Sequence, residues 1–336
     1  MSLPFRVAVA GAGVFGLASA LALARAGAVV TLHDPDLGRT NASAVAAGML
    51  APVSEALTDP TAAPHIDLLL AAQDLWPGFA EAFGLRLDRA GAILLGDAAR
   101  LAVLSATAKD LGLTLPLTDA KPPPLGLGEP AAGLQVAGDW RVEAADLARL
   151  AQAARTLGVS LSKDPPRAGA HDLLVVATGA SQDFQDIAPE LARLTPIKGH
   201  ILRYPGLAYE GPVLRGPGAY AAPGRDGLLV GATMEVGEGQ GGVDPLVAAG
   251  LAARAEAVFP GLMGQAWNAD AGVRAATPDG APLVGPSVSP RVILACGARR
   301  NGWLLAPLVG EVVAAHALGR DPGPWAARLD PRRFGP

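Results

Sequence analysis

The sequence has little cysteine, little charge and few aromatic residues. Cys296 is the one cysteine among 336 residues, so an internal disulfide is impossible, and we expect a reducing, cytoplasmic compartment. Charged residues make up 17% of the chain and the formal net charge is −4. That balance argues against nucleic acid as a main partner, because phosphate binding needs a basic surface.

Clusters of metal-binding or nucleophilic side chains are also missing. Cysteine and histidine show no metal-ligand spacing, so no metal site is expected. We expect Cys296, in a predicted buried strand, to be an inert thiol. The five histidines have no partner at catalytic spacing, and we expect surface or structural roles for all of them: His33, His65, His171, His200 and His316.

The uncharged run 7–24 has two features of a secretory signal: Arg6 precedes it, and a small-residue Ala-Leu-Ala ends it. Three glycines inside the run argue against a signal, and so does Asp34, which cleavage would separate from the glycine turn. The run is also short for a bilayer span. We therefore expect neither export nor a membrane partner.

Half of the residues are hydrophobic, and the length allows two domains with a substantial core. The most informative stretch begins with a predicted buried strand at 7–10, followed by a helix to residue 25 and a second strand at 28–33. Between the first strand and the helix, glycines stand at G-x-G-x-x-G spacing. The pattern predicts a βαβ dinucleotide site that involves Gly11, Ala12, Gly13, Val14, Phe15, Gly16 and Asp34.

Each residue of this pattern has a physical role. Gly11 permits the tight turn, Gly13 lets the backbone approach a pyrophosphate, and Gly16 lets the helix pack close to the strand. The first N–H groups of the helix then face an anion. Asp34 follows the second strand. It stands about 20 residues after the glycine turn, the sequence separation at which an acidic residue typically accepts hydrogen bonds from the ribose of the nucleotide.

The sequence of residues 42–52 is Ala-Ser-Ala-Val-Ala-Ala-Gly-Met-Leu-Ala-Pro. By its pattern alone, this segment predicts an ordinary short helix, with hydroxyl groups that could lie near the glycine turn. The segment resembles the flavin-contacting segment of the D-amino-acid oxidase family, particularly the glycine oxidases of thiamine synthesis. The resemblance implies that FAD is the cofactor and that this segment touches it through Ala42, Ser43, Ala47, Gly48 and Met49. The strand 172–176, which ends in Ala177, Thr178 and Gly179, is similar to the second dinucleotide motif of such flavoproteins and favours FAD over NAD.

Three later residues match family positions that bind the substrate. Tyr220 matches an active-site tyrosine on a hairpin, and Arg274 matches the arginine that forks onto the substrate carboxylate. Arg300 matches an arginine that lies over the substrate. Taken alone, an arginine such as Arg274 is more typical of a structural ion pair, and a tyrosine such as Tyr220 of a packing residue.

The segment 291–316 predicts a strand, a turn and a helix. The start of that helix is expected to stabilise negative charge on a reduced flavin, through Asn301, Gly302, Trp303 and Leu304. Two departures from the family affect the pocket. Ala298 and Arg299 replace a histidine and an aromatic residue, and Trp303 replaces a small aliphatic residue.

The resulting fold class is α/β: a Rossmann-like two-dinucleotide-binding FAD domain with a second α+β substrate domain on a mostly antiparallel sheet. Local patterns predict helices at 62–84 (broken at Pro77), 98–112 and 246–258, strands at 88–95, 201–204, 219–222 and 228–232, a surface loop at 121–130, and a shortened hairpin at 159–170. We expect the FAD domain to comprise 1–82, 140–196 and 290–325, the substrate domain 83–139 and 197–289, and a tail 326–336.

The resemblance implies oxidative deamination of a small amino acid, either a D-amino acid or glycine, with molecular oxygen as acceptor and hydrogen peroxide as product. The lack of a nucleophilic triad fits this chemistry, because the cofactor carries it. Two alternatives stay open: an oxidase or dehydrogenase of N-methyl amino acids such as sarcosine, and a flavin-carrying binding protein without turnover. The oligomeric state is left open.

Overall fold

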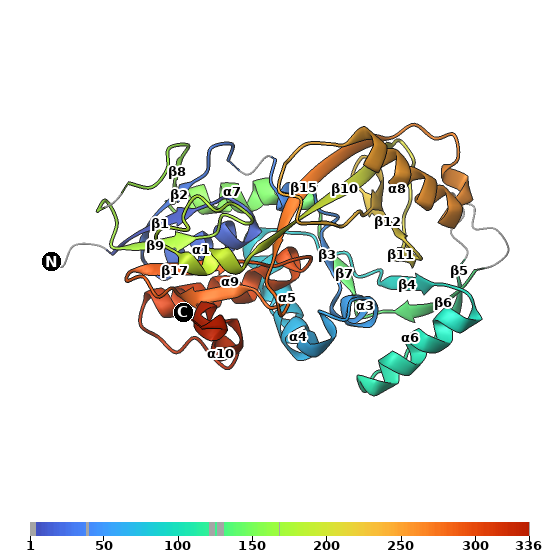
Figure 1. Ribbon diagram of the computed structural model, residues 1–336, viewed down its shortest axis with the longest axis horizontal. Coiled ribbons are helices and arrows are strands. Elements are labelled where there is room, and N and C mark those ends of the chain that lie inside the picture. Colours follow the sequence, from blue (N-terminus) through green and yellow to red (C-terminus); the bar gives the residue numbers. More distant parts are fainter. Residues whose placement is uncertain (1–4, 38–39, 121–124, 126–130, 168, 336) are drawn as a thin grey trace.

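The computed structural model describes residues 5–37, 40–120, 125, 131–167 and 169–335. Its described strands form a six-stranded sheet at one end of an elongated molecule, a nine-stranded sheet at the other, and a pair of short strands (Figure 1). Both chain ends lie at the six-stranded end (Figure 1).

The six-stranded sheet has the order β16-β17-β9-β1-β2-β8. Neighbouring strands are parallel except β16, which is antiparallel to β17. Its strands are β1 (Arg6–Ala10), β2 (Val29–His33), β8 (Ser160–Ser162), β9 (Leu173–Val176), β16 (Leu283–Pro286) and β17 (Val292–Cys296). Apart from the exposed Arg6, the inner strands β1, β9 and β17 are apolar and mostly buried, with Leu173 and Leu174 partly buried, as expected of parallel strands covered on both faces.

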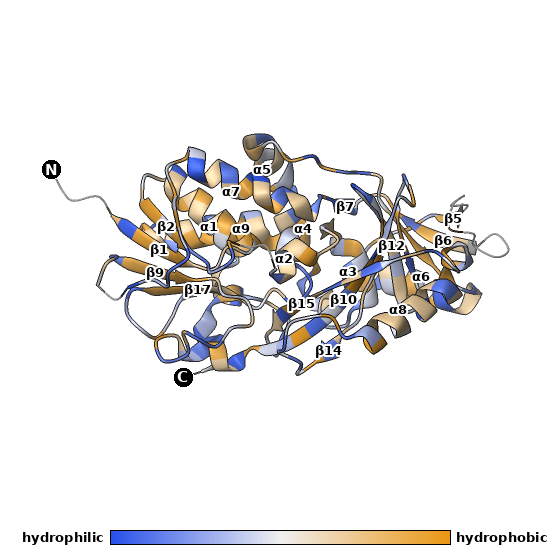
Figure 2. Cartoon of the chain, turned by 90° about the horizontal axis from the view of Figure 1, so that it is seen from above, coloured by the Kyte–Doolittle hydropathy of each residue, from blue (hydrophilic) through white to orange (hydrophobic). Residues whose placement is uncertain are grey.

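Helices α1 (Val14–Arg25) and α9 (Gly302–Ala317) lie side by side against this sheet and are largely apolar (Figure 2). They approach so closely that a Cβ on Gly310 would lie 2.8 Å from the carbonyl oxygen of Ala18. The predicted end of the first helix is confirmed, since Gly27 takes a positive φ of 92° directly after it. The other helices of this half are α4 (Ile66–Asp74), α5 (Trp76–Phe83), α7 (Leu147–Thr156) and α10 (Ala326–Leu329).

The nine-stranded sheet has the order β14-β10-β13-β12-β11-β4-β6-β5, with β15 paired to β10. It is antiparallel except where β11 meets β4. Its strands are β4 (Ala92–Leu95), β5 (Leu117–Ala120), β6 (Ala131–Val136), β10 (Thr195–Pro205), β11 (Val213–Gly216), β12 (Ala219–Gly224), β13 (Gly227–Gly231), β14 (Glu235–Val236) and β15 (Asn268–Ala276). Helix α8 (Pro245–Val258) packs on β10 and β12, and α6 (Ala98–Asp110) packs on β6.

Short elements join the two sheets. These are α2 (Ala42–Val45), β3 (Met49–Leu50), α3 (Pro52–Thr58) and β7 (Trp140–Arg141), with β3 and β7 paired. Helix α2 contacts β15, and a bridge between Ala276 and Ala298 connects the end of β15 to the turn before α9. The same β15 therefore belongs to the large sheet and ends beside the segment that starts α9.

The α/β fold class with a mixed second sheet is confirmed, while several element boundaries differ. The helix predicted at 62–84 is a short 3₁₀ turn (Ala63–His65) followed by α4 and α5, and Pro77 lies in the first turn of α5, where its missing N–H costs nothing. The strand predicted from residue 88 begins at Ala92, because Asp88 forms an isolated bridge with Arg141. In place of a hairpin at 159–170, one strand, β8, adds in parallel to β2. The loop predicted at 121–130 lies outside the described residues except for Leu125.

The domain boundaries stay a prediction. Strand β16 comes from the segment 197–289 but pairs in the six-stranded sheet. The last residues pack against the same sheet, where Leu329 is buried and Arg333 pairs with Asp279. Within the described residues, no helix has both the length and the apolar character to cross a bilayer.

Candidate functional site

The turn between β1 and α1 is built from glycines that leave no room for side chains. Gly11 has φ +102°, and a Cβ there would lie 2.8 Å from the carbonyl carbon of Ala177. A Cβ on Gly16 would collide with the carbonyl oxygen of Gly11. Gly13 differs, because its φ is −69° and its nearest neighbour for a Cβ, the hydroxyl of Ser43, is 3.4 Å away. Gly11 and Gly16 thus shape the turn itself, whereas a Cβ on Gly13 would make only ordinary contacts with Ser43 and Asn41.

Asp34 lies at the end of β2 beside this turn. One carboxylate oxygen, Oδ2, accepts a hydrogen bond from the backbone N–H of Ala12 at 2.7 Å, and Oδ1 accepts one from Asp36 N–H at 3.1 Å. The carboxylate therefore holds the glycine turn against the second strand. Its contact to a ribose stays a prediction.

The segment before α2 faces the same turn. The side-chain oxygen of Asn41 caps α2 by accepting from the N–H groups of Ser43 and Ala44, and the hydroxyl of Ser43 accepts from Val14 N–H at 3.1 Å. The Asn41 side-chain amide nitrogen lies near Gly13, is buried, and has no hydrogen-bond partner within the described part of the chain. Asn41 was not predicted, although an Asn directly before a short helix is a capping signal.

The strand β9 ends at the turn too. Ala177 donates its N–H to the carbonyl of Ala10 at 2.8 Å, and Gly179 has φ +63°. The Thr178 hydroxyl is buried without a partner among the described residues. Cys296 lies behind this strand end, its thiol donating to the carbonyl of Val176, and burial raises the pKa of that thiol to about 11. Its burial and raised pKa fit the predicted inert thiol, which stays a prediction.

These features fit a dinucleotide such as FAD. Three features lie together here: a turn free of side chains, the start of a helix, and the buried side-chain amide of Asn41, which has no partner among the described residues. A buried polar group without a partner is costly, so such groups in a cleft indicate a ligand that satisfies them. The start of α9 lies against the same place, because a Cβ on Gly302 would lie 3.6 Å from a methyl carbon of Val14, and the Trp303 ring nitrogen donates to the carbonyl of Ser43 at 3.0 Å. Leu304 is buried, and its carbonyl accepts from Trp76.

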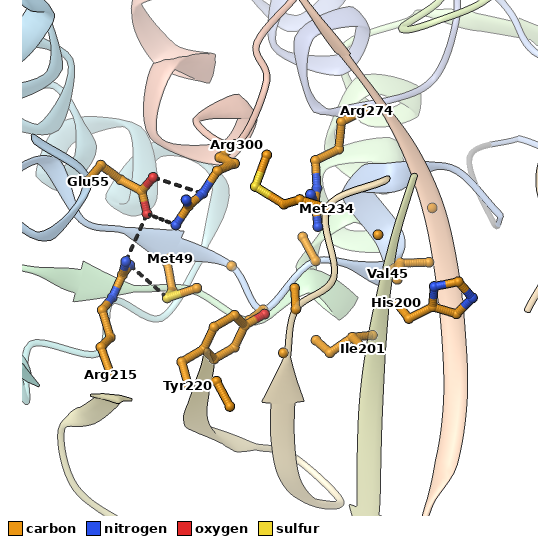
Figure 3. Close-up of a pocket in the computed structure, with 18 of the residues that line it drawn as sticks. Val45, Met49, Glu55, His200, Ile201, Arg215, Tyr220, Met234, Arg274 and Arg300 are labelled. Carbon is orange, nitrogen blue, oxygen red and sulfur yellow. Dashed lines mark hydrogen bonds and ion pairs between the residues drawn. The ribbon is translucent and has the colours of Figure 1, made fainter. Parts of the chain in front are cut away.

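A pocket of about 320 Å³ lies between the two sheets and next to this cleft. Its walls include residues 45–49, parts of β10, β12, β13 and β15, and the start of α9. The predicted residues that line it are Tyr220, Arg274, Arg300, Ala42, Ala47, Gly48, Met49, Asn301 and Trp303 (Figure 3). The structure therefore brings the three predicted substrate-binding side chains together with the segment predicted to touch the flavin. The roles of these residues stay predictions.

Arg274 enters the pocket from β15. Its guanidinium occupies space that a Cβ on Gly199, on the paired strand β10, would fill. Within the described residues its one hydrogen bond is a long one of 3.5 Å, from Nη1 to the carbonyl of Thr233, and no carboxylate pairs with it. Burial lowers its pKa from the ordinary value, yet an arginine stays charged at neutral pH. A desolvated cation in a pocket indicates an anionic ligand.

Tyr220 points into the pocket from β12 (Figure 3). Its ring crosses Gly231 on the neighbouring strand, where a Cβ would overlap the hydroxyl group. Burial raises the pKa of the phenol, so it stays protonated and able to donate a hydrogen bond at neutral pH.

Arg300 is not a free cation. Its Nη2 donates to Glu55 Oε1 at 3.1 Å and its Nε lies 3.1 Å from Oε2, while Arg215 Nη1 donates to the same Oε1 at 2.9 Å (Figure 3). Burial would raise the pKa of Glu55, but Arg300 and Arg215 outweigh it and the pKa is lowered. Glu55 is therefore a fixed carboxylate. Asp59, one turn further along, pairs with Arg299.

Sequence reasoning missed Glu55, Asp59 and Arg215. Glu55 and Asp59 follow directly after the recognised segment 42–52, on and just after α3, so their nearness to it was a usable signal. Arg215 had no such signal. Among the described residues, no three or more side chains of His, Cys, Asp or Glu are grouped so that they could bind a metal ion.

Comparison with known proteins gives one family and a consistent set of relatives. Residues 6–316 match the family model DAO, described as FAD dependent oxidoreductase. The chain is 31% identical to the tRNA 5-methylaminomethyl-2-thiouridine biosynthesis bifunctional protein MnmC of Maricaulis maris, over 94% of this chain and 52% of that protein. It is 30% identical to the glycine oxidase of Geobacillus kaustophilus, over 92% of both chains.

The crystal structure of glycine oxidase from Geobacillus kaustophilus superposes with a TM-score of 0.83 at 26% identity, over 98% of this chain and 99% of that one. The chain spans little more than half the length of the first three curated relatives that it matches, which are bifunctional proteins.

Proposed function

Because the chain belongs to the DAO family of FAD-dependent oxidoreductases, we propose that it oxidises a small α-amino acid, a D-amino acid or glycine. The products are the 2-oxo acid, ammonia and hydrogen peroxide, and molecular oxygen is the electron acceptor. Membership of an enzyme family sets aside the alternative of a binding protein without turnover.

FAD supplies the two-electron acceptor for this chemistry when it is bound. The residues that would hold it are those of the glycine turn, Asn41, Ser43 and Thr178 at the pyrophosphate end, and Ala47 to Met49 at the pocket end. The start of α9 favours negative charge beside the pocket through its dipole and free N–H groups.

The observation that carries the proposal is the unpaired guanidinium of Arg274. A planar fork of donors, desolvated and without a carboxylate among the described residues, fits an amino-acid carboxylate in two parallel hydrogen bonds. Tyr220, on a neighbouring wall and protonated, is placed to donate a further hydrogen bond to the same group. Together they would orient the α-carbon toward the flavin-binding segment.

None of the described residues that line the pocket is a free base. Both oxygens of Glu55 face arginines, and His200 uses Nδ1 toward Glu235 and accepts from Asp244 N–H with Nε2. The chain therefore binds and orients the substrate without taking up its proton. This arrangement agrees with an oxidation carried by the cofactor.

A secondary amine such as sarcosine is the second candidate. The relative named for 5-methylaminomethyl-2-thiouridine biosynthesis matches this chain as well as the glycine oxidase does. The pocket of about 320 Å³ is at the lower end of the volumes usual for ligand pockets, which fits a small secondary amine as well as a small primary one.

Peroxide release from glycine, sarcosine and paired D- and L-amino acids tests the proposal. With the best substrate, Arg274→Ala should lower kcat/KM by the equivalent of about 2–5 kcal/mol, because a buried charge loses its partner. Arg274→Lys should recover only part of the loss, because lysine lacks the fork. Arg155→Ala, on the exposed face of α7, is the matched control. Equal kcat/KM in Arg274→Ala and the control contradicts the role of Arg274.

A further inference from the structure

The pocket contains more positive charge than one amino-acid carboxylate can balance. Among its described lining residues are four arginines, Arg100, Arg215, Arg274 and Arg300, and one carboxylate, Glu55, so the formal excess is +3. Asp59 and Arg299 do not line the pocket: Asp59 pairs with Arg299 and also lies 3.8 Å from Arg300, so this pair leaves the formal excess unchanged. A substrate with one carboxylate on Arg274 and a neutral amine leaves an excess of +2 in a partly desolvated site.

Arg215 is the most deeply buried of the four, with a side chain only 7% exposed. It shares its carboxylate partner, Glu55, with Arg300. Its Nη2 contacts the sulfur of Met49, a weak acceptor, at 3.0 Å, and its buried Nε has no partner within the described residues. A buried guanidinium with unmet donors is expected to face an anion that supplies the missing acceptors.

Arg100 stands at the same end of the pocket. Arg215 on β11 is the register partner of Leu94 on β4, and Arg100 donates from Nε to the carbonyl of the next residue, Leu95, at 3.1 Å. The side chain of Arg100 is partly buried, and no ion pair to it occurs in the described residues. Arg274 lies on the other side of Tyr220 from Arg215 (Figure 3). The pocket thus has a cationic group at each end.

We propose that the preferred substrate is an α-amino acid with a second carboxylate, one carboxylate lying on Arg274 and the other at the Arg215–Arg100 end. This inference rests on the proposed function and specifies its substrate class. The second carboxylate stands either on the side chain, as in D-aspartate and D-glutamate, or on the amine, as in iminodiacetate. In each case the oxidised bond is the one between the amine nitrogen and an α-carbon, and oxygen and water give the oxo acid, the released amine and peroxide.

Isosteric pairs test the inference, because an amide keeps the shape of the carboxylate and removes its charge. Peroxide release is compared for D-aspartate against D-asparagine, D-glutamate against D-glutamine, and iminodiacetate against its monoamide. The acid should have the higher kcat/KM by about tenfold or more in at least one pair, the size expected for one charged contact. A preference in the first two pairs places the second carboxylate on the side chain, and one in the third pair places it on the amine.

Variants locate the contact. Arg100→Gln and Arg215→Gln should lower the acid-to-amide ratio of kcat/KM by about tenfold, because each removes a cation from that end of the pocket. Arg86→Gln removes the same charge from an exposed position outside the pocket and should keep the wild-type ratio. Because Arg215 is buried, bound flavin and the thermal midpoint are measured for each variant, and Arg100→Gln tests the inference even if Arg215→Gln is unstable.

Binding without turnover separates this inference from the proposed function. The thermal midpoint of the holoenzyme is measured with succinate and with its monoamide, succinamate. Oxidation of glycine or neutral D-amino acids without preference for any acid overturns this inference alone. If no amine is oxidised, the proposed function fails, and a larger shift with succinate, lost in Arg100→Gln, still supports a site for two carboxylates. Equal shifts overturn it.

Discussion

At the scale of single residues, the shape of the pocket depends on two glycines that leave room for the side chains of neighbouring strands. Gly199 on β10 leaves the space in which the guanidinium of Arg274 lies, and Gly231 on β13 does the same for the hydroxyl of Tyr220. Both glycines face the chemically active group of a neighbouring strand. They determine where a charge and a donor stand, although neither glycine has a functional group of its own.

Gly199→Ala should therefore act as an indirect mutation of Arg274. The new methyl group overlaps the guanidinium, which must shift, and a displacement of about 1 Å can cost on the order of a hundredfold in rate. We expect kcat/KM to fall by roughly that factor while bound FAD is retained. Gly250→Ala in α8 is the control, because the nearest atom to a Cβ at that position is a side-chain nitrogen of Arg254, 3.7 Å away. Wild-type kinetics for Gly199→Ala would show that Arg274 has room to move.

At the scale of elements, α3 begins without a capping side chain of its own. Asp139, from the segment before β7, accepts hydrogen bonds from the N–H groups of Val53 and Ser54 in its first turn, each at 3.3 Å. Asp139 is 2% exposed, and burial raises its pKa from 3.8 to about 6. Since α3 presents Glu55 to the pocket, the cap also supports the arginine network.

The raised pKa of Asp139 makes the free energy of unfolding depend on pH. Between about pH 4 and 6 the folded chain binds more protons here than the unfolded chain, so this contribution is present below pH 4 and is lost as pH rises. Its full size is on the order of 3 kcal/mol. Asp139→Asn stays neutral, so its thermal midpoint minus that of the wild type should increase from pH 4 to pH 7.

The comparison of Asp139→Asn with the wild type isolates this residue. Glu55, whose lowered pKa has the opposite effect on stability, is present in both proteins, so the difference removes its effect except for its charge interaction with Asp139. The measurement is thermal unfolding of both proteins across the same pH series. A difference that stays constant from pH 4 to 7 would rule out a raised pKa for Asp139.

Elements with local signals were predictable from the sequence, and those that depend on distant partners were not. Three predicted segments each have a periodic pattern of apolar residues next to a glycine. They are the glycine turn, the strand before Ala177 and the turn before α9, and the structure places them at one cleft. β4 was predicted too long because the pairing of Asp88 with Arg141 depends on a residue far along the chain. Arg274, Tyr220 and Arg300 were identified by family resemblance. The pairing of Glu55 with Arg215, 160 residues apart, has no local pattern.

At the scale of the whole molecule, FAD should act as a structural component as well as a reactant. Ligand that binds only the folded chain stabilises it by about 2.7 kcal/mol at a hundredfold excess over Kd. Flavin-stripped protein should therefore unfold at a lower temperature, and its midpoint should rise with added FAD. A midpoint that does not respond to FAD would contradict the cofactor assignment.

Two glycine variants separate the stability of the glycine turn itself from the stabilisation that bound FAD adds. Gly13→Ala adds a methyl group at ordinary contact distance from Ser43, 3.4 Å, with an ordinary φ, so the stripped protein should keep its midpoint and lose most of the response to FAD. Gly16→Ala collides with the backbone of Gly11 and should lower the midpoint of the stripped protein itself. The same response to FAD in Gly13→Ala and wild type would exclude close approach of the ligand to Gly13.

The contact between α1 and α9 imposes an order on assembly. Within this chain, α1 is synthesised well before the helix that covers it, because α9 begins only at Gly302 and the two helices fit closely at Gly310 and Ala18. The strands that flank β1 on one side, β9 and β17, also arrive late. During synthesis, the nucleotide-binding half therefore cannot complete its fold until the middle of the chain has been made, and the apolar surface of α1 stays uncovered until then.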